Sequence, residues 1–412
     1  MRKTQLLIAL AAIGFAGSAS ATNGYFAHGI GIKAKGMGGA SIAFAEDGFG
    51  LASNPATLSQ VQPGVTLGAS VFSPDRAVHM STSYPLGAST KDGNDTSVFL
   101  IPELAYVRHG DNGLSYGVAV YGNGGMNVDY AGPVYDNTNK TYTNMEQLFI
   151  APTIAKKIGE NNTIAASLNL VYQTFEAGGL AWFAGYTRTG AANPGDHGKD
   201  SSTGVGMKLG WTGTISSTVN AGAYYQPETK MSKFDKYRDL FAEDGGFNIP
   251  ATYGVGLSIK ASPATMIAFD IVRIQYGDIK SLANKNNHDW TNTKLGAADG
   301  KGFGWNNMTV YKIGVQHQVD NKTTVRAGWN YGKQPIAADQ LDFNLLAPAV
   351  VQNHMTLGMT RKLDGGGELS LHYMHAFNNA VSGTPAAGTG TLYVDKLEMA
   401  QDEFGVQYAW KF

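Results

Sequence analysis

From about Val65 onward the chain alternates apolar residues with small or polar ones. In residues 205–212, for example, Val, Met, Leu and Trp alternate with Gly, Lys, Gly and Thr. A period of two residues gives a β-strand one apolar face and one polar face. About fourteen such segments follow one another, so we predict an all-β protein that forms a transmembrane antiparallel β-barrel of about 14 strands.

The connections between these segments alternate between short and long. Short turns lie near residues 110–112, 159–162, 216–217, 262–263, 320–321 and 364–366. Long links lie near residues 75–95, 123–143, 176–202, 227–250, 277–307, 334–350 and 378–400. Bacterial outer-membrane barrels have this arrangement, with both termini at the short-turn end. A soluble β-sandwich, the alternative, has no reason to place every long loop at one end.

The last strand ends in an apolar row at every second position. The row consists of Phe404, Val406, Tyr408, Trp410 and the terminal Phe412. An alternating strand that ends on an aromatic residue is typical of the closing strand of outer-membrane barrels. This supports assembly in that membrane over a chance edge strand.

The N-terminus indicates export. Arg2 and Lys3 precede an apolar run over residues 6–17 and the small residues Ala19, Ser20 and Ala21. The run is shorter than the roughly 20 residues that a spanning helix needs. We therefore expect residues 1–21 to be a signal peptide that is cleaved after Ala21.

The segment that follows is rich in glycine and does not alternate. We expect residues 22–60 to form an N-terminal hatch of short helices that plugs the lumen, and residues 61–412 to form the barrel. A disordered leader is the alternative for residues 22–60.

Composition supports this assignment. Charged residues make up 15% of the chain, and no later segment resembles a transmembrane helix. The 53 Gly and 20 Tyr of the sequence fit the same assignment. A β-barrel explains few charges without a hydrophobic helix, because only alternate residues face lipid. The balance of 31 basic against 32 acidic residues gives no basic stripe for nucleic acid. The absence of cysteine excludes disulfides and thiolate chemistry.

The start of the mature chain resembles the family of long-chain fatty acid transporters, the FadL family. The motifs that carry the resemblance are Thr22-Asn23-Gly24-Tyr25-Phe26, Gly29-Ile30-Gly31, Gly36-Met37-Gly38-Gly39-Ala40, Ala45-Glu46-Asp47 and Asn54-Pro55-Ala56. The element Asn54, Pro55 and Ala56 resembles the hatch motif of that family. The order of long and short loops agrees over the whole mature chain.

The resemblance implies a fourteen-stranded barrel whose third strand kinks inward and opens the wall sideways. Here the third strand is expected over Leu114 to Tyr121, and a glycine-rich stretch follows it. The residues expected at the lateral opening are Tyr121, Gly122, Gly124, Gly125, Met126 and Asn127. Glycines at a strand end favour a break in the ladder, although an ordinary loop start is the alternative.

The family also captures its ligand in an apolar groove between the long loops after the fifth and seventh strands. The ligand contacts expected from the resemblance are Tyr25, Phe26, Leu180, Trp182, Phe183, Phe234, Tyr237, Leu240 and Phe241. Exposed aromatic residues on loops are a liability without a partner. The alternative is that the two loops merely pack on each other.

A fatty acid would need a partner for its carboxylate, because an unpaired buried charge is costly. The inward-facing candidates by strand alternation are Lys208, Lys312 and Arg326. Pairing with the hatch residues Glu46 and Asp47 is an equal alternative. An alkane or aromatic hydrocarbon needs no cation.

We therefore expect a passive outer-membrane channel for hydrophobic molecules such as long-chain fatty acids or hydrocarbons, in contact with outer-membrane lipid and monomeric. A general diffusion porin is the runner-up, and an outer-membrane lipid hydrolase is weaker still. The motif Gly113-Leu114-Ser115-Tyr116-Gly117 lies along a strand and not at a nucleophile elbow. His372 and His375 point to opposite faces of one strand, so no metal or cofactor is expected.

Overall fold

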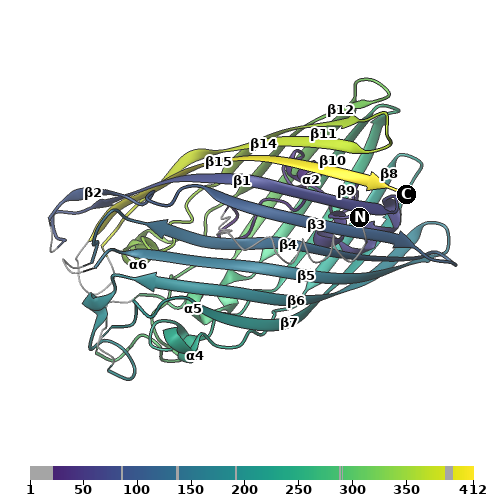
Figure 1. The fold of residues 1–412 in the computed structure, drawn as a ribbon. Helices are drawn as coiled ribbons and strands as arrows, with labels where there is room; N and C mark the ends of the chain where they lie inside the picture. Colours follow the sequence, from purple (N-terminus) through teal and green to yellow (C-terminus); the bar gives the residue numbers. More distant parts are fainter. Residues whose placement is uncertain are drawn as a thin grey trace.

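The computed structural model describes residues 22–84, 87–135, 139–190, 193–286, 289, 291–385 and 393–412. The predicted signal peptide, residues 1–21, lies outside these ranges. The described chain forms one antiparallel sheet in which β15 returns to pair with β1 (Figure 1). The sheet is therefore a closed barrel, and the all-β prediction is confirmed.

Fourteen strands of the described chain form the wall, and the short β2 is an additional strand that pairs with β1 alone. The strands are β1 (Gly64–Met80), β2 (Ser89–Asp92), β3 (Phe99–His109), β4 (Leu114–Asp129), β5 (Tyr142–Ile158), β6 (Asn162–Gly178), β7 (Asp200–Thr214), β8 (Val219–Gln226), β9 (Thr252–Ser262), β10 (Thr265–Ile274), β11 (Met308–Gln318), β12 (Thr323–Gly332), β13 (Asn353–Lys362), β14 (Glu368–Ser382) and β15 (Val394–Lys411).

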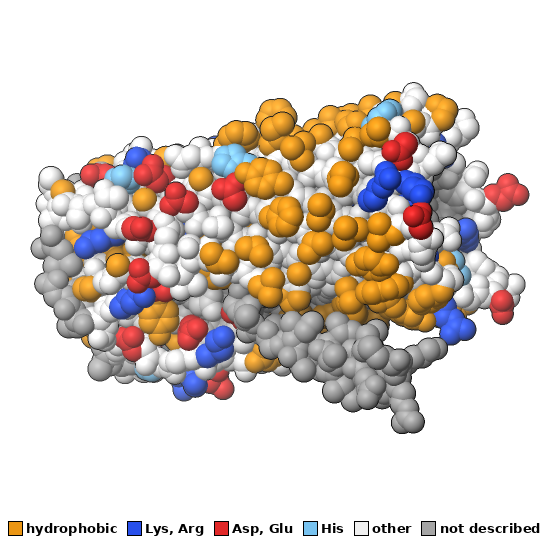
Figure 2. Space-filling model, turned by 45° about the horizontal axis from the view of Figure 1, so that its top comes forward, with side chains coloured by type: hydrophobic (Ala, Val, Ile, Leu, Met, Phe, Trp, Pro, Cys, Tyr) orange, Lys and Arg blue, Asp and Glu red, His pale blue; other side chains and the backbone are white. Residues whose placement is uncertain are grey.

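The period of two residues separates the two faces of the wall. On β7 the outward side chains of Val205, Met207 and Leu209 are 63%, 50% and 47% exposed, whereas the inward Lys208 is buried. Outward apolar residues of other wall strands form the apolar belt in Figure 2, with charged residues gathered toward the two ends. A belt of this kind is stable only against lipid.

The third wall strand is longer than predicted. We expected it to end at Tyr121, but β4 continues through the glycine-rich stretch to Asp129. The reason is that β5 offers a ladder partner along this whole stretch, from Gly122 opposite Leu148 to Asp129 opposite Tyr142. The glycines therefore lie within the strand and not in a following loop.

The segment from Thr22 to Val61 lies inside the barrel near the short-turn end, where Figure 1 shows the C-terminus. Its helical pieces are α2 (Ile32–Lys35), α3 (Gly50–Ser53) and η1 (Pro55–Gln60). Asn54 caps η1 by accepting a hydrogen bond from Ala56 N, and its Nδ2 donates to Trp211 O of the wall at 2.9 Å. We call this segment the hatch.

Glycines on the inner wall let the hatch backbone lie directly against the strands. A Cβ at Gly328 would collide with the backbone of Met37 and Gly38, and a Cβ at Gly222 would collide with the carbonyl of Ile42. Only glycine permits such a close approach. The inner wall is therefore shaped to hold this segment.

The opposite end of the barrel is covered by the long loops and their short helices. These are η2 (Ala181–Phe183), η3 (Asp235–Tyr237), α4 (Ala242–Gly245), η4 (Tyr276–Asp278), α5 (Lys280–Ala283), η5 (Ala338–Gln340) and α6 (Leu341–Asn344). Within the described ranges, no helix is both long and apolar enough to span a membrane.

We predict that Gly328→Val displaces the hatch without preventing barrel assembly, because the new side chain occupies space that the hatch backbone now fills. Current through single channels in a planar bilayer should then exceed that of the wild-type protein. Gly365→Val is the matched control, since a Cβ there has no neighbour within 4 Å. Equal, low currents from all three proteins would show that the hatch does not depend on this close approach.

Candidate functional site

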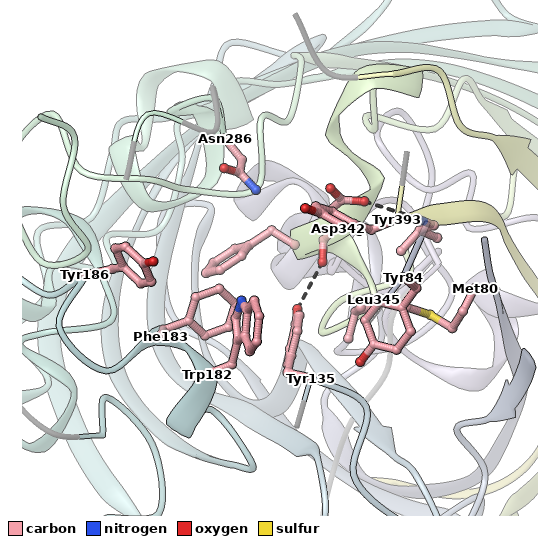
Figure 3. A pocket seen from close by; sticks show the side chains of 12 residues that line it. Met80, Tyr84, Tyr135, Trp182, Phe183, Tyr186, Asn286, Asp342, Leu345 and Tyr393 are labelled. Atoms are coloured by element: carbon pink, nitrogen blue, oxygen red, sulfur yellow. Dashed lines mark hydrogen bonds between the residues drawn. The ribbon is translucent and has the colours of Figure 1, made fainter. Parts of the chain in front are cut away.

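The long-loop end contains an apolar cavity of about 200 Å³ (Figure 3). Its lining residues come from six separate loops or strand ends and are Met80, Tyr84, Tyr135, Trp182, Phe183, Tyr186, Asn286, Asp342, Phe343, Leu345, Tyr393 and Val394. The rings of Tyr135 and Phe183 meet edge to face at 4.8 Å, and the Tyr135 hydroxyl donates to Asp342 O at 3.0 Å. We call this cavity the aromatic groove.

Two of the predicted ligand contacts, Trp182 and Phe183, line this groove. Trp182 is 49% exposed at its rim, and Phe183 is buried in its wall. Leu180, also predicted, is buried one residue before η2 and does not line it. Aromatic residues on this loop were visible in the sequence, but their partners on the other loops were not.

The predicted contacts on the loop after the seventh wall strand lie elsewhere. These residues are Phe234, Tyr237, Leu240 and Phe241. All four are buried, and the three rings pack on Phe175, with Phe234 at 5.8 Å, Tyr237 at 4.7 Å and Phe241 at 4.6 Å. Burial raises the pKa of Tyr237 to about 12. The structure thus brings them together as a second aromatic cluster, and their contact with a ligand stays a prediction.

A continuous series of buried rings leads from the groove into the barrel. Its members are Tyr135, Phe183, Phe343, Phe303, Trp305, Tyr276, Tyr25 and Phe26. Each ring centroid lies between 4.8 and 6.1 Å from the next. We call this series the aromatic column. It ends on the two hatch residues, Tyr25 and Phe26, that the sequence resemblance assigned to the ligand.

At the inner end of the column the barrel wall has a gap. The β3–β4 ladder stops at Leu104 opposite Val120, although β3 begins at Phe99 and β4 continues to Asp129. The β4–β5 register also shifts between Gly122 and Gly124, which leaves Asn123 as an extra residue. This is a β-bulge, and it bends the strand away from β3.

The hatch supplies hydrogen bonds that β3 does not. Ala27 N donates to Asn123 O at 3.0 Å, and Gly125 N donates to Tyr25 O at 3.0 Å. Phe26 and Gly124 form a β-bridge, and a Cβ at Gly124 would collide with Tyr25 O. The hatch therefore covers the inner side of the gap, beside the residues predicted for a lateral opening.

The three candidate cations contact the hatch. Lys208 donates to Ala52 O, and Lys312 donates to His28 O at 2.9 Å and to Gly39 O at 3.3 Å. Lys208 and Lys312 also line a small cavity that includes Phe26 and Asn123.

Arg326 forms an ion pair with Glu46 of the hatch. The second hatch acid, Asp47, accepts from Gln407 Nε2 at 2.8 Å. Pairing with an acidic hatch residue, one of the two roles that the sequence left open, is thus present for Arg326.

Lys35 anchors the hatch to the wall. Its Nζ lies 3.0 Å from Glu103 Oε1 and 2.9 Å from Glu403 Oε1, and all three side chains are almost fully buried. Burial disfavours the ammonium form, but the two carboxylates outweigh it and raise the pKa of Lys35. Nearby, burial lowers the pKa of His28 well below its ordinary value despite Glu403 at 3.7 Å. Buried charges this close are stable only while all partners remain.

The sequence profile of the outer membrane protein transport protein family (OMPP1/FadL/TodX) matches residues 13–372. The chain belongs to the OMPP1/FadL/TodX family. Its members are outer-membrane transport proteins, so this protein is an outer-membrane transporter and not an enzyme. The long-loop end of such a barrel is extracellular.

Solved structures agree with the fold of an OMPP1/FadL/TodX protein. The toluene transporter TodX of Pseudomonas putida has a TM-score of 0.68 and 19% identity, over 93% of this chain and 99% of that chain. The toluene transporter TbuX of Ralstonia pickettii has a TM-score of 0.66 and 16% identity, over 93% and 99%. A FadL homologue of Pseudomonas aeruginosa has a TM-score of 0.70 and 13% identity, over 94% and 100%. No curated protein matches the sequence.

We predict that Lys35→Met weakens hatch docking by about 3 kcal/mol or more, because it leaves two buried carboxylates without their cation. Protease cleavage within the hatch of the purified barrel should be faster. Lys33→Met is the matched control, since its partner Glu368 keeps an ion pair with Lys411. If the two variants are cleaved equally fast, Lys35 has no special role as an anchor.

Proposed function

We propose that the protein carries small neutral hydrophobic molecules, such as monoaromatic hydrocarbons, from the extracellular side into the outer membrane by passive diffusion. The aromatic column carries this proposal, because it joins the groove at the cell surface to the gap in the wall. Two structurally similar proteins, TodX and TbuX, are described as toluene transporters.

The groove suits a neutral aromatic solute. Among the described residues that line it, Asp342 is the one that carries a charge, and its carboxylate would repel that of a fatty acid. Ring-to-ring contacts contribute about 0.5–1.5 kcal/mol beyond the burial of apolar area. A solute held there stays out of water and exchanges one set of ring contacts for the next.

We propose lateral release at the gap between β3 and β4. Successive ring centroids of the column lie only 4.8 to 6.1 Å apart, so passage requires these side chains and the first residues of the hatch to move. The gap opens toward lipid, where an apolar molecule is more stable than in water by about 0.8 kcal/mol per CH₂. A general diffusion porin would need a water-filled lumen, whereas here the hatch occupies it.

A long-chain fatty acid is the second candidate substrate. Lys208 and Lys312 in the small cavity near Phe26 favour it, because a carboxylate there would meet two cations. Lys208→Met should reduce uptake of a fatty acid and leave toluene uptake unchanged if both substrates use this cavity.

We predict that Phe183→Ser combined with Phe343→Ser lowers toluene uptake about tenfold at limiting concentration, because two aromatic contacts are lost. Uptake of labelled toluene by intact cells measures this, with surface expression quantified in parallel. Tyr253→Ser on the lipid-facing wall is the control. Phe234→Leu tests whether the second aromatic cluster takes part in uptake. Unchanged uptake by the Phe183→Ser, Phe343→Ser variant would show that the groove does not bind the solute.

Lateral release is tested by deleting Asn123, the extra residue of the bulge. The deletion keeps the β5 register and lets β4 straighten toward β3, which should abolish toluene uptake in a barrel that still resists heat in detergent. Asn123→Ala keeps the bulge and should transport normally. Normal transport by the folded deletion variant would mean that the solute leaves through the periplasmic mouth.

A further inference from the structure

Arg76 lies at the extracellular end of the gap between β3 and β4. Its side chain points inward from β1 and is 1% exposed. The guanidinium donates four hydrogen bonds, to Asn94 Oδ1 at 3.2 Å, Thr96 O at 2.6 Å, Asn127 O at 2.6 Å and Asn127 Oδ1 at 2.8 Å. All four acceptors are neutral oxygens, so this arginine is held by the chain segments that it connects.

These segments meet where the ordinary ladder is missing. The pairing of β1 with β3 ends at Phe72, and the pairing of β3 with β4 ends at Val120. Gly93 and Asp95 bond to the backbone of Asp129, but this bridge does not include the carbonyls of Thr96 and Asn127, which therefore have no ladder partner across the gap. A backbone carbonyl at the border of a membrane wall is costly when unsatisfied. The planar fork of one arginine reaches both carbonyls at once.

The polar contacts continue from Arg76 across three strands. Asn127 Nδ2 donates to Asn144 Oδ1 at 3.2 Å, Asn144 Nδ2 donates to Glu146 Oε1 at 3.1 Å, and Thr174 Oγ1 donates to Glu146 Oε2 at 3.4 Å. This row, from Arg76 to Thr174, forms a polar edge along the extracellular side of the gap.

Apolar residues lie on the other side of this edge. The outer wall there has a cavity of about 160 Å³, lined on one side by Pro102, Gly122, Leu148 and Tyr172 and on the other by the polar residues Glu146, Gln147, Thr174 and Lys199. Tyr172 is 43% exposed on the lipid-facing surface. A hydrophobic solute that leaves the gap would therefore meet apolar side chains below a polar boundary.

We propose that Arg76 is a positioning residue that fixes the extracellular edge of the lateral gap and keeps β3 and β4 apart. This rests on lateral release as proposed above. Without the guanidinium, the carbonyls of Thr96 and Asn127 lose their donor. These carbonyls can regain hydrogen-bond donors if the β3–β4 ladder extends in its existing register. That extension would bring Ile101 opposite Asn123 and close the gap.

The test compares Arg76→Met with Arg76→Lys and with Arg273→Met. Arg273 is a half-buried wall arginine on β10 that donates to Gln275 and Thr309, away from the gap. Arg76→Met should lower toluene uptake about tenfold, Arg76→Lys should give an intermediate value because it keeps the charge but not the fork, and the control should match the wild-type protein.

A second measurement reports the gap itself. The chain contains no cysteine, so Ile101→Cys with Asn123→Cys introduces a single pair. Residues directly opposite each other in a ladder lie within disulfide distance. Oxidation should join the pair faster in the Arg76→Met background than in the wild-type background, as measured by gel mobility. If Arg76→Met does not assemble, the same comparison with Arg76→Lys decides.

The outcomes separate this inference from the proposed function. Suppose that both Arg76 variants show wild-type uptake and crosslinking, while deletion of Asn123 abolishes uptake. This result would overturn the role of Arg76 and leave lateral release intact. Normal uptake in the Asn123 deletion as well would overturn lateral release, and the inference with it. Lower uptake together with faster crosslinking supports the assignment.

Discussion

The structure depends on the requirement that every backbone N–H and C=O in a membrane wall find a hydrogen-bond partner. Over most of the barrel the neighbouring strand supplies it. Between β3 and β4 the ladder is interrupted, and other groups replace it: Gly93 and Asp95 bond to the backbone of Asp129 at the end of β4, and two further sources act along the interruption. The hatch bonds to the bulge around Gly124 from inside, and the guanidinium of Arg76 takes the carbonyls at the extracellular edge. The gap is therefore built into the wall, and its partners are placed accordingly.

The same requirement links the hatch to the path that we propose for the solute. Tyr25 and Phe26 belong both to the aromatic column and to the backbone contacts that cover the gap. A movement that frees the gap thus also opens the inner end of the column. Lys35 holds the rest of the hatch in place through two buried carboxylates, so this movement can remain confined to the first residues of the hatch.

The barrel was predictable from the sequence because the period of two residues and the alternating loop lengths are local signals. The hatch was predictable from its position and its glycines. The continuation of β4 to Asp129 was not, because the glycines favoured a break and only the pairing with β5 keeps the strand extended. Two residues named from the sequence, Trp182 and Phe183, line the cavity that we call the aromatic groove, and their contact with a ligand stays a prediction. Phe183 was named from the aromatic residues of its own loop. Tyr135 and Phe343 contact it from distant loops, and a contact of this kind leaves no periodic pattern in the sequence.

We propose that an aromatic solute passes from the groove to lipid through the wall. A photoreactive aryl probe, activated during uptake and mapped by mass spectrometry, tests it most directly. Adducts should appear on Phe183 in the groove, on Phe26 at the inner end of the column, and on Pro102 or Leu148 at the outer lip of the gap. Adducts at the periplasmic mouth, near Val61 and His109, with none on the outer lip, would contradict the account.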